Sequence, residues 1–364
     1  RLVAGKDAAA VELAGISWPG FDSGATFVTG LGIQKEPTWA GSDFAAAVHT
    51  LKLLGFTAVR LPFSFGDLQA APQDVARPCA GAPPNATQLA QRAADPGAAL
   101  KGSGLRPTPE LYLPPGYGVG GVCNSYVPRG PTALARLLWA TEFRGRAGFY
   151  VVLDYRPPAP PALSASAGAS SGHGVDSGTA AATGPPELAT PAAFAAAWQR
   201  LGAALTCLPG GKAQLAGRVV FAMLSSPGKF GIGWRGSGGA AGARRPLGEY
   251  YTAALDALDA AGPSGLLYVL QGGGGGGGGS FVTGKQEAAK LGVEDAVGFF
   301  GALASKPYRG RVVLGTSIMA GADGSAGLAV GPQQWEGYAA QWWVLAARAP
   351  RACGCCIVGS AAEP

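Results

Sequence analysis

The chain has 364 residues, of which 48% are hydrophobic and 14% are charged, so it is long enough for one large α/β domain or two ordinary ones. Its net charge of +6 comes from scattered Lys and Arg residues, whereas nucleic-acid-binding domains gather them on one face with aromatic residues between them. No nucleic-acid partner is therefore predicted. No run of about 18 apolar residues occurs either, so no membrane span is predicted.

Short apolar segments alternate with helical segments along the chain. Seven strands are expected, at 15–21, 58–63, 149–153, 219–224, 266–270, 312–315 and 357–359. Most are too continuously apolar for a strand with one exposed face, which is typical of parallel strands covered on both faces. Six helices are expected between them, at 42–54, 131–142, 191–205, 247–261, 293–304 and 332–347. The alternation predicts an α/β fold of parallel βαβ units, and the number of strands favours a (β/α)8 TIM barrel over a doubly wound sheet.

Three segments interrupt this alternation. Residues 69–129 are a long insertion rich in Pro and Gly, residues 157–186 are a low-complexity loop, and residues 272–279 are a run of eight glycines. All three follow predicted strands, where a barrel carries its functional loops. The sequence stops just after the seventh strand, so we expect a single barrel domain over 1–364 whose last strand and helix belong to a longer chain.

The cysteines and one glycosylation motif indicate an oxidising compartment. The chain has an even number of cysteines, whose pairing the sequence alone does not decide: Cys79, Cys123, Cys207, Cys353, Cys355 and Cys356. Cys79 and Cys123 bracket the insertion and are expected to pair, and Cys207 would then pair with one of the last three. Asn85 opens an Asn-Ala-Thr acceptor in the insertion, so an extracellular or cell-surface location is predicted. The last three cysteines lack a second Cys/His pair at zinc-site spacing, so neither a metal nor another cofactor is predicted.

Four motifs follow one another in the order of a known family. The segment 15–21 reads GISWPGF where the family has G-x-N-W-x-G-F, and 54–62 reads LGFTAVRLP where it has L-G-(F/Y)-x-x-(V/I)-R-L-P. The third strand reads VVLDYRP at 151–157 and is similar to V-x-L-D-x-H-R-P, and 299–314 is similar to the stretch that leads into the sixth strand. Over nearly its whole length the chain therefore resembles the cellulase-like barrels of glycoside hydrolase family 5.

The resemblance places serine at both catalytic carboxylates of that family. Its acid/base is the Glu of an Asn-Glu-Pro after the fourth strand, where this chain has Ser225, Ser226 and a proline. Its nucleophile is the Glu of a (V/I)-x-G-E after the seventh strand, where this chain has Ser360. A retaining glycosidase needs one carboxylate to carry negative charge and one carboxylic acid to deliver a proton, and a serine hydroxyl does neither. We therefore predict no catalytic residue at these positions.

The neighbouring positions of the resemblance are changed as well. Tyr155 is the residue nearest to the family's third-strand His. The His-x-Tyr after the sixth strand corresponds to Ser317 and Met319. Arg60, which orients the nucleophile in the family, is retained. Losses at several positions of one site indicate a catalytically degenerate member rather than a single chance substitution.

The sequence is compatible with three functions. The first is a non-catalytic barrel that serves as a structural or assembly component of a secreted or cell-surface glycoprotein structure, with other glycoproteins, polysaccharide or further domains of the same chain as partners. The alternative is a carbohydrate-binding barrel, in which Trp18 and Trp234 stack on sugar rings and Arg60 donates hydrogen bonds. The second alternative is an active glycosidase with relocated carboxylates; Asp154, at the end of the third predicted strand, is expected to be structural instead.

Overall fold

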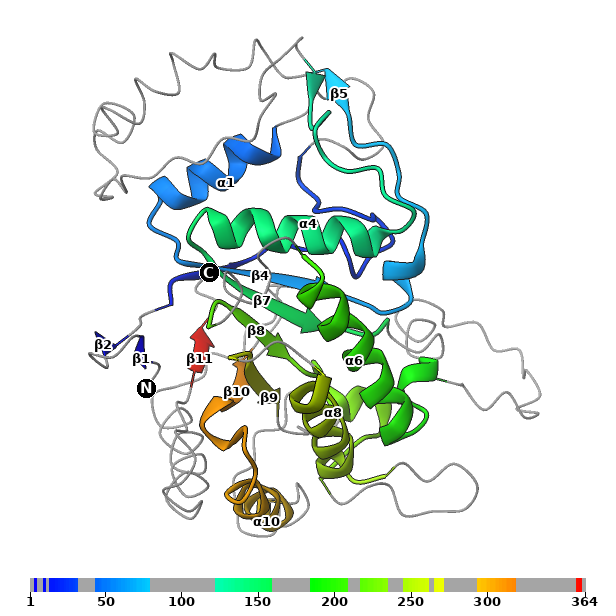
Figure 1. Cartoon of the computed structure of the whole chain (residues 1–364), viewed down its shortest axis with the longest axis vertical. Helices are drawn as coiled ribbons and strands as arrows, with labels where there is room; N and C mark the ends of the chain where they lie inside the picture. The colour runs from blue at the N-terminus through cyan, green and yellow to red at the C-terminus, as the bar shows by residue number, and fades with distance from the viewer. Residues whose placement is uncertain are drawn as a thin grey trace, which may run out of the picture. The chain divides into compact units, whose positions relative to one another are not determined.

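The computed structural model describes residues 3–4, 9–10, 13–31, 43–78, 122–158, 184–208, 217–234, 245–261, 265–271, 293–318 and 358–361. The chain divides into two compact units. The first, here called the N-terminal unit, holds residues 4–156 and 204–221, and the second, the C-terminal unit, holds residues 1–3, 157–203 and 222–364. Figure 1 labels the helices and strands of both units.

Parallel strands form the centre of the N-terminal unit. Strand β3 (Gly15–Ser17) pairs with β4 (Ala58–Phe63), and β4 pairs with β7 (Tyr150–Tyr155), both in parallel. The β-branched and aromatic residues of these segments favour the extended conformation, and Leu61 and Leu153 are fully buried. This is the burial expected for strands that helices cover.

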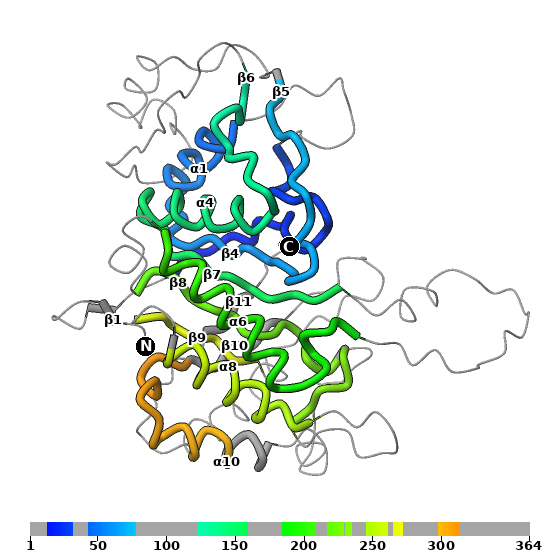
Figure 2. Tube along the Cα trace, turned by 45° about the vertical axis from the view of Figure 1, so that its right-hand side comes forward, coloured from blue at the N-terminus to red at the C-terminus, as the bar shows by residue number. Residues whose placement is uncertain are grey.

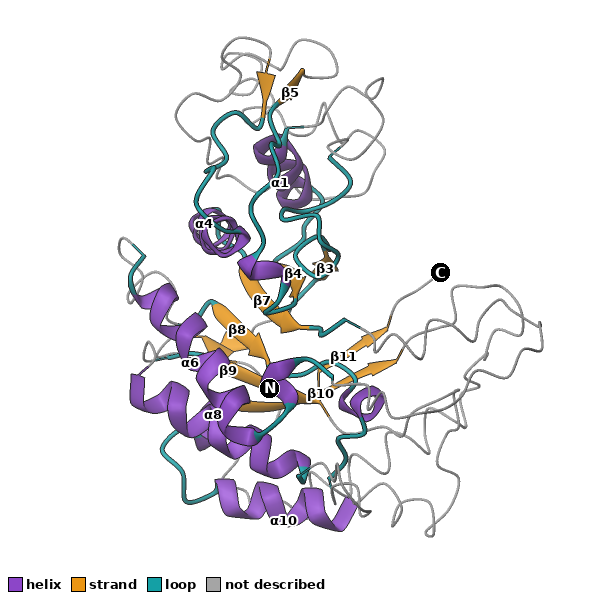
Figure 3. Cartoon of the chain, turned by 90° about the vertical axis from the view of Figure 1, so that its right-hand side faces the viewer, coloured by secondary structure: helices purple, strands orange, loops and turns teal. Residues whose placement is uncertain are grey.

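Two helices lie on the same side of β4 and β7 in the N-terminal unit, as Figures 1 and 3 show: α1 (Phe44–Leu53) and α4 (Ala133–Arg146). Helix α1 begins after Asp43, whose side chain accepts hydrogen bonds from the backbone N–H groups of Ala45 and Ala46. Such an N-cap satisfies donors that the first turn leaves unpaired. Because the first side chain of α1 is fully buried, the cap also fixes how this helix packs on the sheet.

The two ends of the predicted insertion form a small antiparallel ladder. Strand β5 (Arg77–Pro78) pairs with β6 (Val122–Cys123), and both lie beyond α1 on the side away from β4 (Figure 2). Cys123 is buried there, whereas its predicted partner Cys79 and the predicted glycosylation site Asn85 lie outside the described residues. The pairing and the modification therefore stay predictions.

Three parallel strands also belong to the C-terminal unit: β9 (Leu267–Gln271), β10 (Val312–Ile318) and β11 (Val358–Ala361). Strand β10 pairs with both of the others in parallel. The boundary between the units falls within β8 (Val219–Ala222), and just after it the N–H of Met223 donates to the carbonyl oxygen of a β9 residue. The three strands occur in the chain order that the sequence predicts.

Helices precede these strands in the chain. They are α6 (Pro191–Thr206), α8 (Leu247–Ala261) and α10 (Val293–Leu303). In Figure 3, α8 and α10 lie to the outer side of β9 and β10. Helix α8 is held through Tyr250, which is fully buried and donates a hydrogen bond to the carbonyl oxygen of Leu188. None of the helices that the structure describes is both long and apolar enough to cross a membrane.

The predicted α/β class, with parallel strands alternating with helices, is confirmed. Strand β4 has the predicted bounds, whereas β7 runs two residues beyond the predicted end at 153, so Asp154 and Tyr155 belong to the strand. The described strands form no closed barrel, and the predicted helix at 332–347 lies outside the described residues, as do most of the loops at 157–186 and 272–279. The extent of a single domain over 1–364 stays a prediction.

Cys207 lies directly after the last residue of α6, where it is exposed and free. Its predicted pairing with one of the last three cysteines stays a prediction. Cys353, Cys355 and Cys356 lie outside the described residues.

Candidate functional site

Strand pairing brings four charged side chains together on one face of the N-terminal unit, here called the charged row: Asp22, Arg60, Asp154 and Arg156. The register places Pro62 opposite Asp154, so Arg60, two residues earlier on β4, projects from the same face and lies diagonally across from that carboxylate. The Nη2 atom of Arg60 donates to Oδ2 of Asp154 at 2.7 Å. This short, charge-assisted bond fixes the guanidinium.

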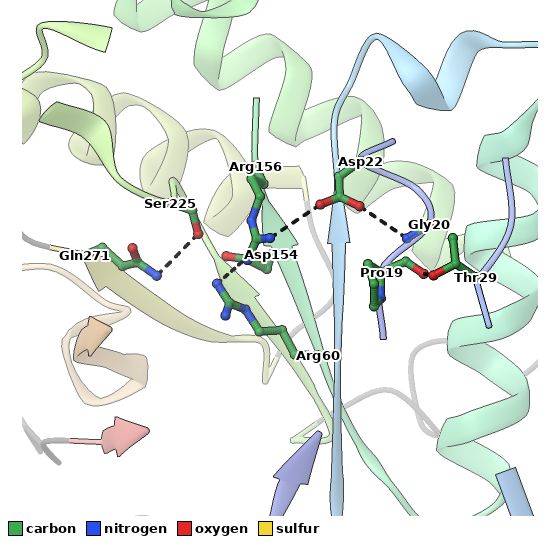
Figure 4. Close-up of polar contacts among 9 residues, drawn as sticks. All are labelled: Pro19, Gly20, Asp22, Thr29, Arg60, Asp154, Arg156, Ser225 and Gln271. Carbon is green, nitrogen blue, oxygen red and sulfur yellow. Dashed lines mark hydrogen bonds and ion pairs between the residues drawn. The ribbon is translucent and has the colours of Figure 1, made fainter. Parts of the chain in front are cut away.

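Arg156 lies between the two carboxylates of the charged row, as Figure 4 shows. Its backbone N–H donates to the carbonyl oxygen of Phe63, which extends the β4–β7 pairing by one step. Its Nη2 lies 3.8 Å from Oδ2 of Asp154, and its Nη1 lies 3.6 Å from Oδ2 of Asp22. The other oxygen of Asp22 accepts a hydrogen bond from the N–H of Gly20. The four side chains therefore alternate in charge along the row.

The carboxylates of the charged row are buried beneath its guanidinium groups. The side chain of Asp154 is 0% exposed and that of Asp22 is 9% exposed, against 27% for Arg60 and 39% for Arg156. A fully buried carboxylate that contacts two guanidinium groups is part of the fold rather than a group offered to a substrate. These contacts support the structural role expected for Asp154 and leave positive groups toward solvent.

A second polar group follows β8 in the C-terminal unit. The N–H of Ser226 donates to Oε1 of Gln271 at 3.3 Å. The Nε2 of Gln271 donates to Oγ of Ser225 at 3.4 Å (Figure 4). Ser226 has φ 54° and ψ 55°, the left-handed conformation that costs a residue other than glycine about 1–2 kcal/mol. The amide of Gln271, at the end of β9, thus holds a strained turn at the position where the resemblance expects the acid/base.

Gln271 is itself anchored through its backbone. Its carbonyl oxygen accepts a hydrogen bond from the hydroxyl of Tyr251 at 2.7 Å. Burial raises the pKa of the Tyr251 phenol above its ordinary value, so this group stays a neutral donor. Sequence reasoning missed Gln271, although the signal was present as a polar residue at the carboxyl end of a predicted strand, where barrels place functional residues.

Two other positions of the resemblance lie opposite each other. Ser317 of β10 and Ser360 of β11 are direct partners in the parallel register. Met319 lies outside the described residues. Tyr155 is fully buried, with its ring 4.8 Å from that of Phe65, and strand alternation places it on the opposite face of β7 from Asp154. The structure therefore brings two of the serines into register and sends Tyr155 into the core.

Both tryptophans proposed for sugar stacking make contacts within the protein. Trp18 donates from Nε1 to the carbonyl oxygen of Thr29 and stacks on Phe44, with ring centroids 5.6 Å apart and planes inclined by 26°. The guanidinium of Arg144 lies 4.8 Å from the same indole ring. Trp18 remains partly exposed. Trp234 is 8% exposed and lies in an aromatic cluster of the C-terminal unit with Tyr251, Phe299 and Phe300.

No protein-family profile and no curated protein matches the chain. Solved structures do resemble it. The catalytic domain of the major endoglucanase from Xanthomonas campestris pv. campestris has a TM-score of 0.45 at 18% identity, covering 87% of this chain and 66% of that chain. An endocellulase from Pyrococcus horikoshii, in a complex with cellotetraose, has a TM-score of 0.44 at 16% identity, covering 89% and 67%. A glycoside hydrolase family 5 enzyme from Prevotella bryantii has a TM-score of 0.40 at 10% identity, covering 94% and 74%.

The first two of these proteins are an endoglucanase and an endocellulase, and the third is a glycoside hydrolase of family 5. The chain spans about two thirds of the length of the first two. At these identities and TM-scores nothing about substrate or activity passes from them to this chain.

Proposed function

We propose that the chain is a non-catalytic extracellular barrel, resembling glycoside hydrolase family 5, that serves as a structural or assembly component of a secreted or cell-surface glycoprotein structure. The observation that carries the proposal is the turn after β8. Ser226 stands there where the family has a carboxylic acid, and its backbone is bonded to the amide of Gln271. An amide and a hydroxyl donate and accept hydrogen bonds but do not exchange protons with a leaving group near neutral pH.

The second catalytic position supports the same proposal. Ser360 of β11 is in register with Ser317 of β10. Both of these neighbouring positions therefore hold a serine, and neither holds a carboxylate. A retaining mechanism fails if either carboxylate is missing, because the nucleophile carries the covalent intermediate and the acid assists departure of the sugar. General acid–base assistance alone contributes about 10²–10⁴-fold to a rate. With both groups replaced, we expect no turnover of β-glucans or mannans.

The packing of the tryptophans favours a scaffold over a barrel that binds neutral sugars by stacking. A sugar ring needs an open aromatic face, and the indole of Trp234 is surrounded by three aromatic rings and is 8% exposed. The indole of Trp18 is stacked on Phe44 and approached by a guanidinium. These rings contribute to packing in their own units.

The test combines a hydrolysis assay with a search for the assembly partner. The purified chain is incubated with β-glucans and mannans, and released reducing ends are compared with those of a heat-inactivated sample. We expect no difference. Chemical cross-linking on the native cell surface, followed by mass spectrometry, should then join this chain to other glycoproteins of that layer. Hydrolysis that a Ser226→Ala variant leaves intact would point to relocated carboxylates and refute the proposal, as would a protein that is found only inside the cell.

A further inference from the structure

The charged row turns its cations outward and its anions inward. Its two guanidinium groups are 27% and 39% exposed, whereas its two carboxylates are 0% and 9% exposed. The formal charges cancel, but a molecule that approaches from solvent meets Arg60 and Arg156 before either acid. The net charge of the whole chain, +6, acts in the same direction at long range.

Arg156 is held in place without being saturated by its carboxylates. Its Nη atoms lie 3.6 Å from Asp22 and 3.8 Å from Asp154, whereas a charge-assisted hydrogen bond between N–H and a carboxylate spans about 2.7–2.9 Å. The two acids therefore attract and orient the guanidinium from opposite sides but do not bind its N–H groups at full strength. An anionic oxygen arriving from solvent can approach those N–H groups more closely than either acid does.

Arg60 lies next to this point on the same face. Its Nη2 and the Nη2 of Arg156 both point at one oxygen, Oδ2 of Asp154, at 2.7 Å and 3.8 Å. Two guanidinium groups that share one buried carboxylate are fixed relative to each other, so little side-chain entropy remains to be lost on binding. Planar forks of this kind suit the paired oxygens of carboxylates and sulfates.

We infer that Arg156, with Arg60 beside it, binds the anionic groups of an acidic polysaccharide, either the carboxylate of a uronic acid or a sulfate ester. This deepens the proposed function, because it names the class of polymer to which the scaffold attaches, and it rests on that function only in that the bound polymer is not cleaved. Affinity arises from the anionic groups rather than from stacking on Trp18 or Trp234.

The test uses the full chain and four polymers: polygalacturonate for carboxylates, dextran sulfate for sulfates, and dextran and hydroxyethyl cellulose as neutral controls. Binding is measured by titration calorimetry at low ionic strength and repeated at about 0.5 M salt, where exposed charges are screened. The decisive variant is Arg156→Gln, which leaves Asp154 its 2.7 Å bond to Arg60. The matched control is Arg129→Gln, which removes the same charge from the same unit at an 82% exposed side chain paired with Asp74 at 3.7 Å.

We expect at least one anionic polymer to bind, both neutral polymers to fail, and Arg156→Gln to weaken binding at least tenfold while Arg129→Gln changes it less than twofold. Thermal unfolding verifies that each variant is folded; if Arg156→Gln is not, Arg156→Lys keeps the charge, loses the planar fork and should still weaken binding severalfold. Absence of binding, equal binding of neutral polymers, or equal losses in the two Gln variants would overturn the site. Shortening of a bound polymer would instead refute the non-catalytic function and leave the site standing.

Discussion

Arg144 of α4 offers a quantitative test of how the N-terminal unit is held together. It is 0% exposed, and its guanidinium lies 4.8 Å from the ring of Trp18 and 4.7 Å from that of Phe44. Its Nη1 donates to the carbonyl oxygen of Ala140, but within the part of the chain that the structure describes its Nε and Nη2 make no hydrogen bond. We consider the substitution Arg144→Met, which keeps a long side chain in this site and removes the charge.

Two opposing contributions nearly cancel at neutral pH. Burial lowers the pKa of Arg144 from 12.5 to about 9, and since one pKa unit corresponds to about 1.36 kcal/mol, keeping the group charged costs the folded state about 5 kcal/mol. Against this stand two cation–π contacts, each about 2 kcal/mol when desolvated, and one hydrogen bond from a charged donor, about 1.5–3 kcal/mol. We therefore expect Arg144→Met to change the free energy of unfolding at pH 7 by less than about 2 kcal/mol.

The pH dependence gives the sharper test. Between about pH 9 and 12.5 the unfolded chain keeps a proton on Arg144 that the folded chain has released, so stability rises with pH in this window. Urea unfolding of the wild type and of Arg144→Met is measured at pH 8, 9 and 10. The free energy of unfolding of the wild type minus that of the variant should rise by about 1 kcal/mol from pH 8 to 10. Tyrosines and lysines titrate in both proteins and cancel in this difference. A difference that is flat or falls over this range would refute the reasoning.

Three further substitutions test other parts of the structure. Gln271→Leu removes both amide hydrogen bonds to the turn after β8 and should lower the free energy of unfolding by about 1–2 kcal/mol in urea titrations, with Gln271→Asn giving no rescue because its side chain is shorter. Gly20→Ala should destabilise by about 3 kcal/mol or more, because φ is +147° there and the new Cβ would lie 2.0 Å from the carbonyl oxygen of Phe27; an unchanged melting temperature would contradict this close approach. Cys207→Ser should remove one rapidly reacting thiol equivalent per folded chain in a titration with a disulfide reagent, and an unchanged thiol count would show that Cys207 is not free.

The bounds of strand β4 were predictable because residues next to the strand in the sequence determine them. Gly55, which adopts φ +84° just after the C-cap residue of α1, separates helix from strand, and the apolar run ends with Phe63. The end of strand β7 was not predictable from the sequence, because a charged residue at the edge of an apolar run usually marks the start of a loop. Asp154 stays in the strand because Arg60, 94 residues earlier, supplies a cation on the neighbouring strand. A prediction from the pattern of neighbouring residues does not detect partners that lie so far apart in the sequence.

The candidate sites show the same limit. Counting along the motif makes Tyr155 the residue nearest to the family's histidine, but adjacent residues of a strand face opposite sides, and only Asp154 reaches the charged row. The sequence predicts Ser226 in the segment that follows the fourth strand, and it lies there, after β8. Its left-handed backbone was not predictable, because it depends on an amide from β9. The positions of site residues followed from the motifs; their surroundings depended on the register of strands far apart in the chain.

Burial separates the Arg60–Asp154 pair from Ser226, two parts of the resemblance that differ in what the fold requires. Asp154 is fully buried and bonded to Arg60. Removing one partner of a buried ion pair leaves the other charge buried and unpaired, at a cost of about 3–5 kcal/mol. Such a pair persists whether or not the chain has a reaction to perform, because the fold depends on it. Ser226 is exposed, so exchanging a carboxylic acid for serine there costs the fold little. Replacing either member of the buried Arg60–Asp154 pair should therefore destabilise the fold far more than replacing the exposed Ser226.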